Sequence, residues 1–95
     1  MRRIVMDGEG WATGDDLYDA FFRAVGAPEW HGRNFNALRD SICRGRINSV
    51  EVPYVVTIMN YSRIGLAARG MADDFIELIK ELHASGCAVD VEVLD

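Results

Sequence analysis

The chain has few cysteines and no long apolar run. Its two cysteines, Cys43 and Cys87, lie far apart and outside any C-x-x-C pair. A disulfide-stabilised scaffold needs more cysteines than this, so we expect both to be reduced thiols in a cytoplasmic protein. The apolar run near the amino terminus ends at Asp7, which is too short for a signal peptide. No stretch approaches the ~20 apolar residues that a membrane span requires.

Motifs that bind phosphates or metals are also missing. The chain contains no G-x-G-x-x-G and no P-loop, and no histidine or cysteine spacing suits a metal ion. We therefore expect no cofactor and no metal. His31, Asp40 and Cys43 could lie close together, but nothing in the sequence orients the histidine or activates the thiol for nucleophilic attack. The sequence accordingly predicts a protein that is not an enzyme.

Basic residues are outnumbered by acidic ones. Fifteen aspartates and glutamates against ten lysines and arginines give a net charge of −5. Affinity for nucleic acid backbones rests on basic residues, whereas an acidic protein associates faster with a basic one. The balance reverses locally, because residues 29–46 hold two acids and four arginines. The 95 residues, 49% of them apolar, suffice for one domain, residues 1–95, with a modest core.

Hydrophobic periodicity divides the chain into alternating strands and helices. One helix is bounded by a capping-box pattern at Thr13 and Asp16 and by Gly26. The other predicted elements are strands over 3–7, 54–59 and 89–93 and helices over 34–44, 62–69 and 75–82. Strands separated by helices pair in parallel through right-handed crossovers. The prediction is a two-layer α/β fold, with a three-stranded parallel sheet in order 1-2-3 covered by about four helices.

The segment from Pro28 to Asp40 combines a rigid loop with the start of a helix. Pro28 restricts the backbone, Gly32 allows a sharp turn, and Asn34 is a favoured N-cap. At about 100° per residue the helix places on one face Phe35, Leu38 and Ile42. The opposite side carries Asn36, Asp40 and Cys43, beside Trp30 and His31 of the loop. An exposed aromatic side chain beside a carboxylate indicates a recognition surface.

This segment, Pro-Glu-Trp-His-Gly-Arg-Asn-Phe-Asn-Ala-Leu-Arg-Asp, resembles the motif of the barstar family, the intracellular inhibitors of barnase-type ribonucleases. The strand before Gly8, the strand after Pro53 and the Gly86 and Cys87 pair before the last strand fall in the family's order. The resemblance covers essentially the whole chain. It implies an immunity protein that binds one-to-one, is a monomer when free, and occludes the active site of a small secreted-type ribonuclease or ribonuclease-type toxin.

The resemblance also implies roles for individual residues. Asp40 would be the central carboxylate among the enzyme's cationic groups, and Trp30 would be the aromatic anchor. Gly32 and Asn34 would hold the loop, and Glu81 would lie at the edge of the interface. The full set of expected partner contacts is Trp30, His31, Gly32, Asn34, Asn36, Arg39, Asp40, Cys43, Arg46 and Glu81.

Three positions depart from the family pattern. Asn36 stands where a second carboxylate is expected, and Arg39 and Arg46 fall at or near aromatic positions. The loop between Gly45 and Pro53 is a few residues longer. The added positive charge disfavours barnase itself through like-charge repulsion. We therefore expect as partner a relative of that ribonuclease with a matching acidic patch, or a different toxin.

Two other interpretations stay open. The first is an RNA-associated module that uses phosphate contacts and base stacking, from Arg33, Arg39, Arg44, Arg46 and Trp30. The second is that these are ordinary surface features: Trp30 an isolated aromatic, Asp40 a charge on a solvated helix face, and Glu81 a local partner of Lys80. His31 is expected to be a loop residue whose protonation tunes binding.

Overall fold

The computed structural model describes residues 1–95 and contains three strands and three α-helices. The elements follow in the order β1 (Arg2–Asp7), α1 (Gly14–Val25), α2 (Phe35–Cys43), β2 (Tyr54–Met59), the 3₁₀ turn η1 (Tyr61–Arg63), α3 (Leu66–Ala84) and β3 (Val89–Val93). The predicted strands and the first two predicted helices are confirmed.

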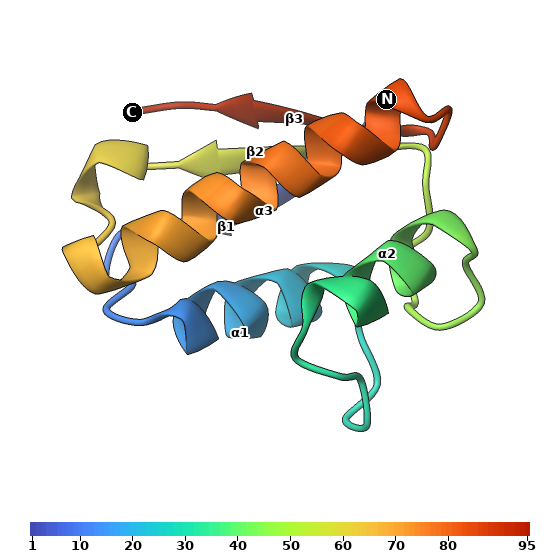
Figure 1. The fold of residues 1–95 in the computed structure, drawn as a ribbon, viewed down its shortest axis with the longest axis horizontal. Coiled ribbons are helices and arrows are strands. Elements are labelled where there is room, and N and C mark those ends of the chain that lie inside the picture. The colour runs from blue at the N-terminus through green and yellow to red at the C-terminus, as the bar shows by residue number, and fades with distance from the viewer.

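The three strands form one parallel sheet in the predicted order β1-β2-β3. Residues 2–7 of β1 lie opposite 54–59 of β2, and 54–58 of β2 lie opposite 89–93 of β3. Figure 1 shows the helices in front of the strands, with α2 and its flanking loops at one end of the molecule. This is the two-layer α/β architecture that the element order predicts.

The core lies between the sheet and helices α1 and α3. Phe21 of α1 and Phe75 of α3 are fully buried and meet edge to face, with ring centroids 5.5 Å apart. Helix α2 adds only Leu38 and Ile42 to this core. Four of its nine residues are exposed: Asn36, Arg39, Asp40 and Cys43.

The opposite face of the sheet carries no helix in Figure 1. Val5 of β1 and Met59 of β2 are exposed there. Between them, Thr57 is covered by two long side chains: Arg3 donates to its hydroxyl (3.4 Å), and the hydroxyl donates to Glu92 (2.7 Å). Strand β2 is central, as its apolar run predicts, but helices cover only one of its faces.

The ends of α1 and α2 follow their sequence signals. The Asp16 carboxylate accepts hydrogen bonds from the backbone N–H groups of Ala12 (2.7 Å) and Thr13 (3.1 Å), and Gly26 ends α1 with φ at 64°. The Asn34 side chain accepts from the backbone N–H of Ala37 (2.8 Å) at the start of α2. These caps set the length of the loop that joins the two helices.

The prediction of two separate helices over 62–69 and 75–82 is wrong. A single helix, α3, runs from Leu66 through Gly70 to Ala84, and only the 3₁₀ turn η1 precedes it. Gly70 keeps the helical conformation because Ala68, Ala72 and Phe75 around it are fully buried. Their burial outweighs the roughly 1 kcal/mol that glycine costs inside a helix. The sheet is thus covered by three α-helices instead of about four.

The prediction that both cysteines are reduced is also wrong for this structure. Cys43, at the end of α2, forms a disulfide with Cys87, which precedes β3, and their Cα atoms lie 5.6 Å apart. The 44-residue sequence separation conceals this proximity. Helix α2 and the turn after α3 come together only in the folded chain, so spacing alone could not reveal the pair.

Candidate functional site

The loop between α1 and α2 presents one large aromatic side chain to solvent and buries the next residue. Trp30 is 74% exposed, whereas the adjacent His31 is only 7% exposed. Pro28 contributes a backbone carbonyl that accepts from the His31 N–H (3.0 Å), which closes a tight turn around Trp30. An exposed tryptophan held on a tight turn can be buried by a partner at small entropic cost.

His31 lies in the loop, as expected, and its buried side chain anchors that loop to the helices. Its Nδ1 lies 2.9 Å from the Gly32 carbonyl, which can only accept, so Nδ1 carries the proton. Its Nε2 forms a hydrogen bond with the Ser41 hydroxyl of α2 at 2.8 Å. The ring also packs on Phe22 of α1, with centroids 4.5 Å apart. His31 therefore ties the loop to both helices.

A pocket of about 180 Å³ opens beside Trp30. Its lining residues come from the loop, from α2 and from the segment after α2: Trp30, His31, Gly32, Ala37, Asp40 and Ile47. Four of the expected contact residues thus gather in one place. Ala37 and Ile47 were not predicted as site residues, and only the added length of the loop after Gly45 pointed to a role for Ile47.

Asp40 supplies the carboxylate of this pocket. Its side chain is 58% exposed, and one oxygen lies 3.6 Å from Arg44 Nε one helical turn later. An exposed pair of this kind holds its partners weakly, so another cation can displace Arg44 from the carboxylate. An apolar wall of Trp30 and Ile47 beside a carboxylate suits the stem and the charged end of an arginine or lysine.

Arg39 and Glu81 lie outside the pocket and pair with each other. Arg39 Nη2 of α2 donates to Glu81 Oε2 of α3 at 2.9 Å, across a groove of about 240 Å³. Lys80, the suggested local partner of Glu81, instead lies 3.8 Å from Glu77. The positive charge at Arg39 is therefore partly offset within the chain, by a solvent-exposed pair. Asn36 is exposed on the same helix.

Cys43 and Arg46 do not line the pocket. Cys43 is bonded to Cys87 and has no thiol for nucleophilic chemistry. Arg46 is exposed in a left-handed conformation (φ 67°), and its backbone N–H donates to the Glu51 carboxylate. Ile47, the next residue along the chain, lines the pocket together with Trp30.

The arginines required by the RNA-binding interpretation are dispersed. Arg33 pairs with Asp15 and Asp19, Arg39 with Glu81, and Arg44 with Asp40. Three of the four are thus already engaged by carboxylates, and the fourth, Arg46, lies on the other loop. No group of three or more histidine, cysteine or acidic side chains is placed to hold a metal ion. No helix is long and apolar enough to cross a membrane.

Comparison with known proteins decides the family. The model described as Barstar (barnase inhibitor) matches residues 1–93. This chain belongs to the barstar family. A relative from Bacillus subtilis (strain 168), named "Putative ribonuclease inhibitor YrdF", is 28% identical over 81 residues, which cover 85% of each chain. Membership of the barstar family, together with this relative, supports a ribonuclease inhibitor role for the chain.

Proposed function

We propose that this protein binds one-to-one to a small secreted-type ribonuclease or ribonuclease-type toxin and occludes its active site. The observation that carries the proposal is the pocket in which the Asp40 carboxylate lies beside the exposed Trp30. A ribonuclease active site holds cationic side chains to bind phosphate. One such side chain would enter the pocket, stack on Trp30 and pair with Asp40.

The remaining contacts surround this pocket. Asn36 and the joined Arg39 and Glu81 extend along α2 toward α3 and would meet the rim of the enzyme. Asn36 and Arg39 carry less negative charge than the family pattern at these positions. The target would accordingly be a relative of barnase with an acidic patch facing α2, or a different toxin, whose attraction to Arg39 offsets the missing carboxylate.

The mechanism is steric and electrostatic, and the inhibitor itself performs no catalysis. The net charge of −5 attracts a basic enzyme and speeds the encounter. The loop is held by His31 and the Asn34 cap before binding, so little conformational entropy is lost on docking. We propose that the free protein is a monomer that acts in the cytoplasm, where it protects cellular RNA from the enzyme. Reducing conditions there would open the Cys43–Cys87 bond, so inhibition does not depend on it.

The test is calorimetric titration of the protein against a panel of barnase-type ribonucleases and toxin domains. Asp40→Ala should weaken the cognate complex by about 2–5 kcal/mol, the range for truncating one member of a buried charge pair. Asp90→Ala is the matched control, because Asp90 is an exposed carboxylate on β3, away from the pocket. A loss below about 0.5 kcal/mol for Asp40→Ala would show that this carboxylate is not the anchor.

The same titrations distinguish ribonuclease inhibition from RNA binding. Binding to single-stranded RNA alone, with no binding to any ribonuclease of the panel, would reject inhibition and favour the RNA-associated module. Hydrolysis of RNA by the purified protein would reject the non-enzymatic mechanism.

A further inference from the structure

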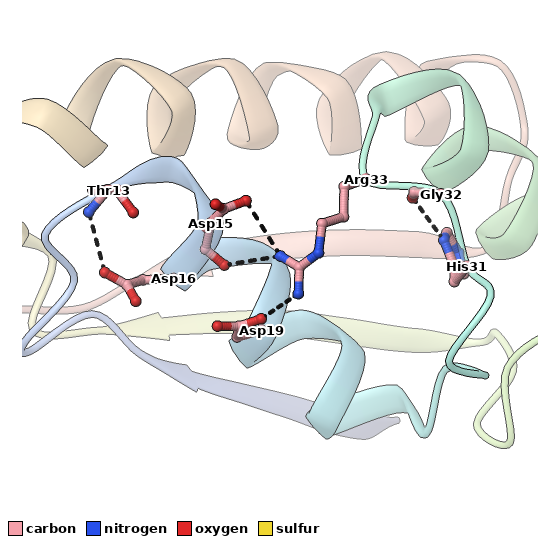
Figure 2. A network of polar contacts seen from close by, with 7 residues as sticks. All are labelled: Thr13, Asp15, Asp16, Asp19, His31, Gly32 and Arg33. Carbon is pink, nitrogen blue, oxygen red and sulfur yellow. Dashed lines mark hydrogen bonds and ion pairs between the residues drawn. The ribbon is translucent and has the colours of Figure 1, made fainter.

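Arg33 does not line the pocket, and its side chain reaches from the loop back to α1 (Figure 2). Its Nη1 donates to the backbone carbonyl of Asp15 (3.3 Å) and lies 3.4 Å from the Asp15 carboxylate. Its Nη2 donates to the carboxylate of Asp19, one turn further along α1. These contacts, first of all the bond to Asp19, raise the pKa of the guanidinium, so Arg33 stays charged.

The same guanidinium rests on an aromatic surface of α1. The central carbon of the Arg33 guanidinium lies 5.6 Å from the ring centroid of Phe22, which also packs against His31 at 4.5 Å. His31 and Arg33, which flank Gly32 in the sequence, therefore both pack on the ring of Phe22. Between them, a side chain at Gly32 would crowd Ala37 and the Asn34 amide, at 3.3 and 3.1 Å. The backbone at Gly32 is thus closely confined.

Side chains, and not the backbone, attach this loop to the fold. No backbone hydrogen bond joins residues 28–33 to another element, and the bond between His31 and Pro28 is internal to the loop. His31 and Arg33 are the side chains that connect the loop to α1. Of the two, Arg33 is 46% exposed and lies at the outer edge, so solvent can compete for its bonds.

We propose that Arg33, through Asp15 and Asp19, is a positioning residue that holds Trp30 in the conformation that a ribonuclease binds. The inference rests on the proposed function, which it deepens by assigning a role to a residue outside the pocket. When the guanidinium loses its partners, the loop pivots on His31 and Trp30 leaves the rim of the pocket. The apparent affinity then falls in proportion to the fraction of molecules with the loop in place.

The experiment compares Arg33→Gln, Asp19→Asn and the double variant with the wild-type protein. Arg63→Gln is the matched control, because Arg63 makes a similar exposed pair with Glu9 at 3.2 Å outside the loop and the pocket. The first measurement is the ¹⁵N heteronuclear NOE of the two tryptophan indoles in the free protein. Trp11 is 6% exposed in the core and serves as the internal reference for the exposed Trp30.

We expect both single variants to lower the NOE of the Trp30 indole and of amides 29–34 while leaving Trp11 unchanged. The Kd for the cognate ribonuclease should rise about three- to tenfold in each variant, with no further rise in the double variant. An effect on net charge alone would give opposite results in the two variants. Arg33→Gln makes the inhibitor more acidic and would tighten binding to a basic enzyme, whereas Asp19→Asn makes it less acidic and would weaken binding. Opposite signs in the two variants would overturn the positioning role.

The NMR measurement does not depend on the partner. If no ribonuclease binds, the proposed function fails, while a loosened Trp30 in both variants still shows that Arg33 orders the loop. If Trp30 stays as ordered as in the wild type, the positioning role is rejected even where a ribonuclease binds tightly. Should Arg33→Gln fail to fold, Asp19→Asn weakens the same attachment from the other side, because it removes the negative charge that Arg33 Nη2 contacts, and it gives the same readouts.

Discussion

Opening the Cys43–Cys87 bond should cost the free protein a large share of its stability. The bond closes a loop with a sequence separation of 44 residues. Loop-closure entropy for that length is about 13 cal/mol/K, which corresponds to about 4 kcal/mol at 25 °C. A protein of 95 residues has roughly 5–14 kcal/mol of unfolding free energy in total. Cys43 is exposed and Cys87 is only partly buried, so serine in their places removes little core packing that would add to this loss.

The assay is urea denaturation of the oxidised protein, of the same protein with reductant, and of the Cys43→Ser/Cys87→Ser variant. We expect the last two to agree with each other and to lie about 4 kcal/mol below the oxidised protein. A control titration counts free thiols in the unreduced, denatured chain. Two free thiols, or equal stability with and without reductant, would refute the reasoning, because the disulfide would then be absent or without effect on the unfolded chain.

Two further predictions concern single side chains. Trp30→Ala should weaken ribonuclease binding by about 2 kcal/mol or more. The thermal midpoint should move by less than about 3 °C, because the side chain is 74% exposed. A large fall in the midpoint would make Trp30 part of the core instead. Asp16→Asn should make the stability of the protein fall less steeply with acid. Hydrogen bonds from the backbone N–H groups of Ala12 and Thr13 lower the pKa of Asp16 in the folded protein. The carboxylate therefore stabilises the fold fully above about pH 4, and this contribution is lost as the pH falls through the lowered folded-state pKa. Thermal midpoints of both proteins between about pH 6 and about pH 2 check this, and parallel curves would contradict it.

The sequence predicted most of the fold because its signals are local. The capping carboxylate of Asp16, the N-cap Asn34 and the αL glycine Gly26 each act within a few residues of their own position. The helix was wrongly predicted to end at Gly70, because the low helix propensity of glycine favours a helix break there. Burial of the neighbouring residues favours a continuous helix instead. Whether propensity or burial decides the outcome depends on tertiary packing, which cannot be read from the sequence.

The candidate site was predicted only in part for the same reason. Helical spacing placed Asp40 on the outer side of α2, beside the loop that carries Trp30, and the structure brings both residues into one pocket. Ile47 reaches that pocket from the other end of α2, across a loop with no periodicity. His31 looks like a surface loop residue until Ser41 and Phe22, from two different helices, close around it. The pairing of Arg33 with Asp19 likewise spans two elements.

The ion pairs around α2 have a consequence for the ionic-strength dependence of complex formation. Asp40 already has a cation at 3.6 Å, and Glu81 holds Arg39 at 2.9 Å. When an enzyme arginine or lysine approaches, each carboxylate exchanges one cation for another and does not gain its first. Added salt screens the bond that is lost as well as the bond that is formed. The affinity of the complex should therefore vary with ionic strength less steeply than the number of acidic residues on this surface suggests. Discrimination between enzymes should depend more on how well each enzyme cation fits its site than on the total charge of the enzyme.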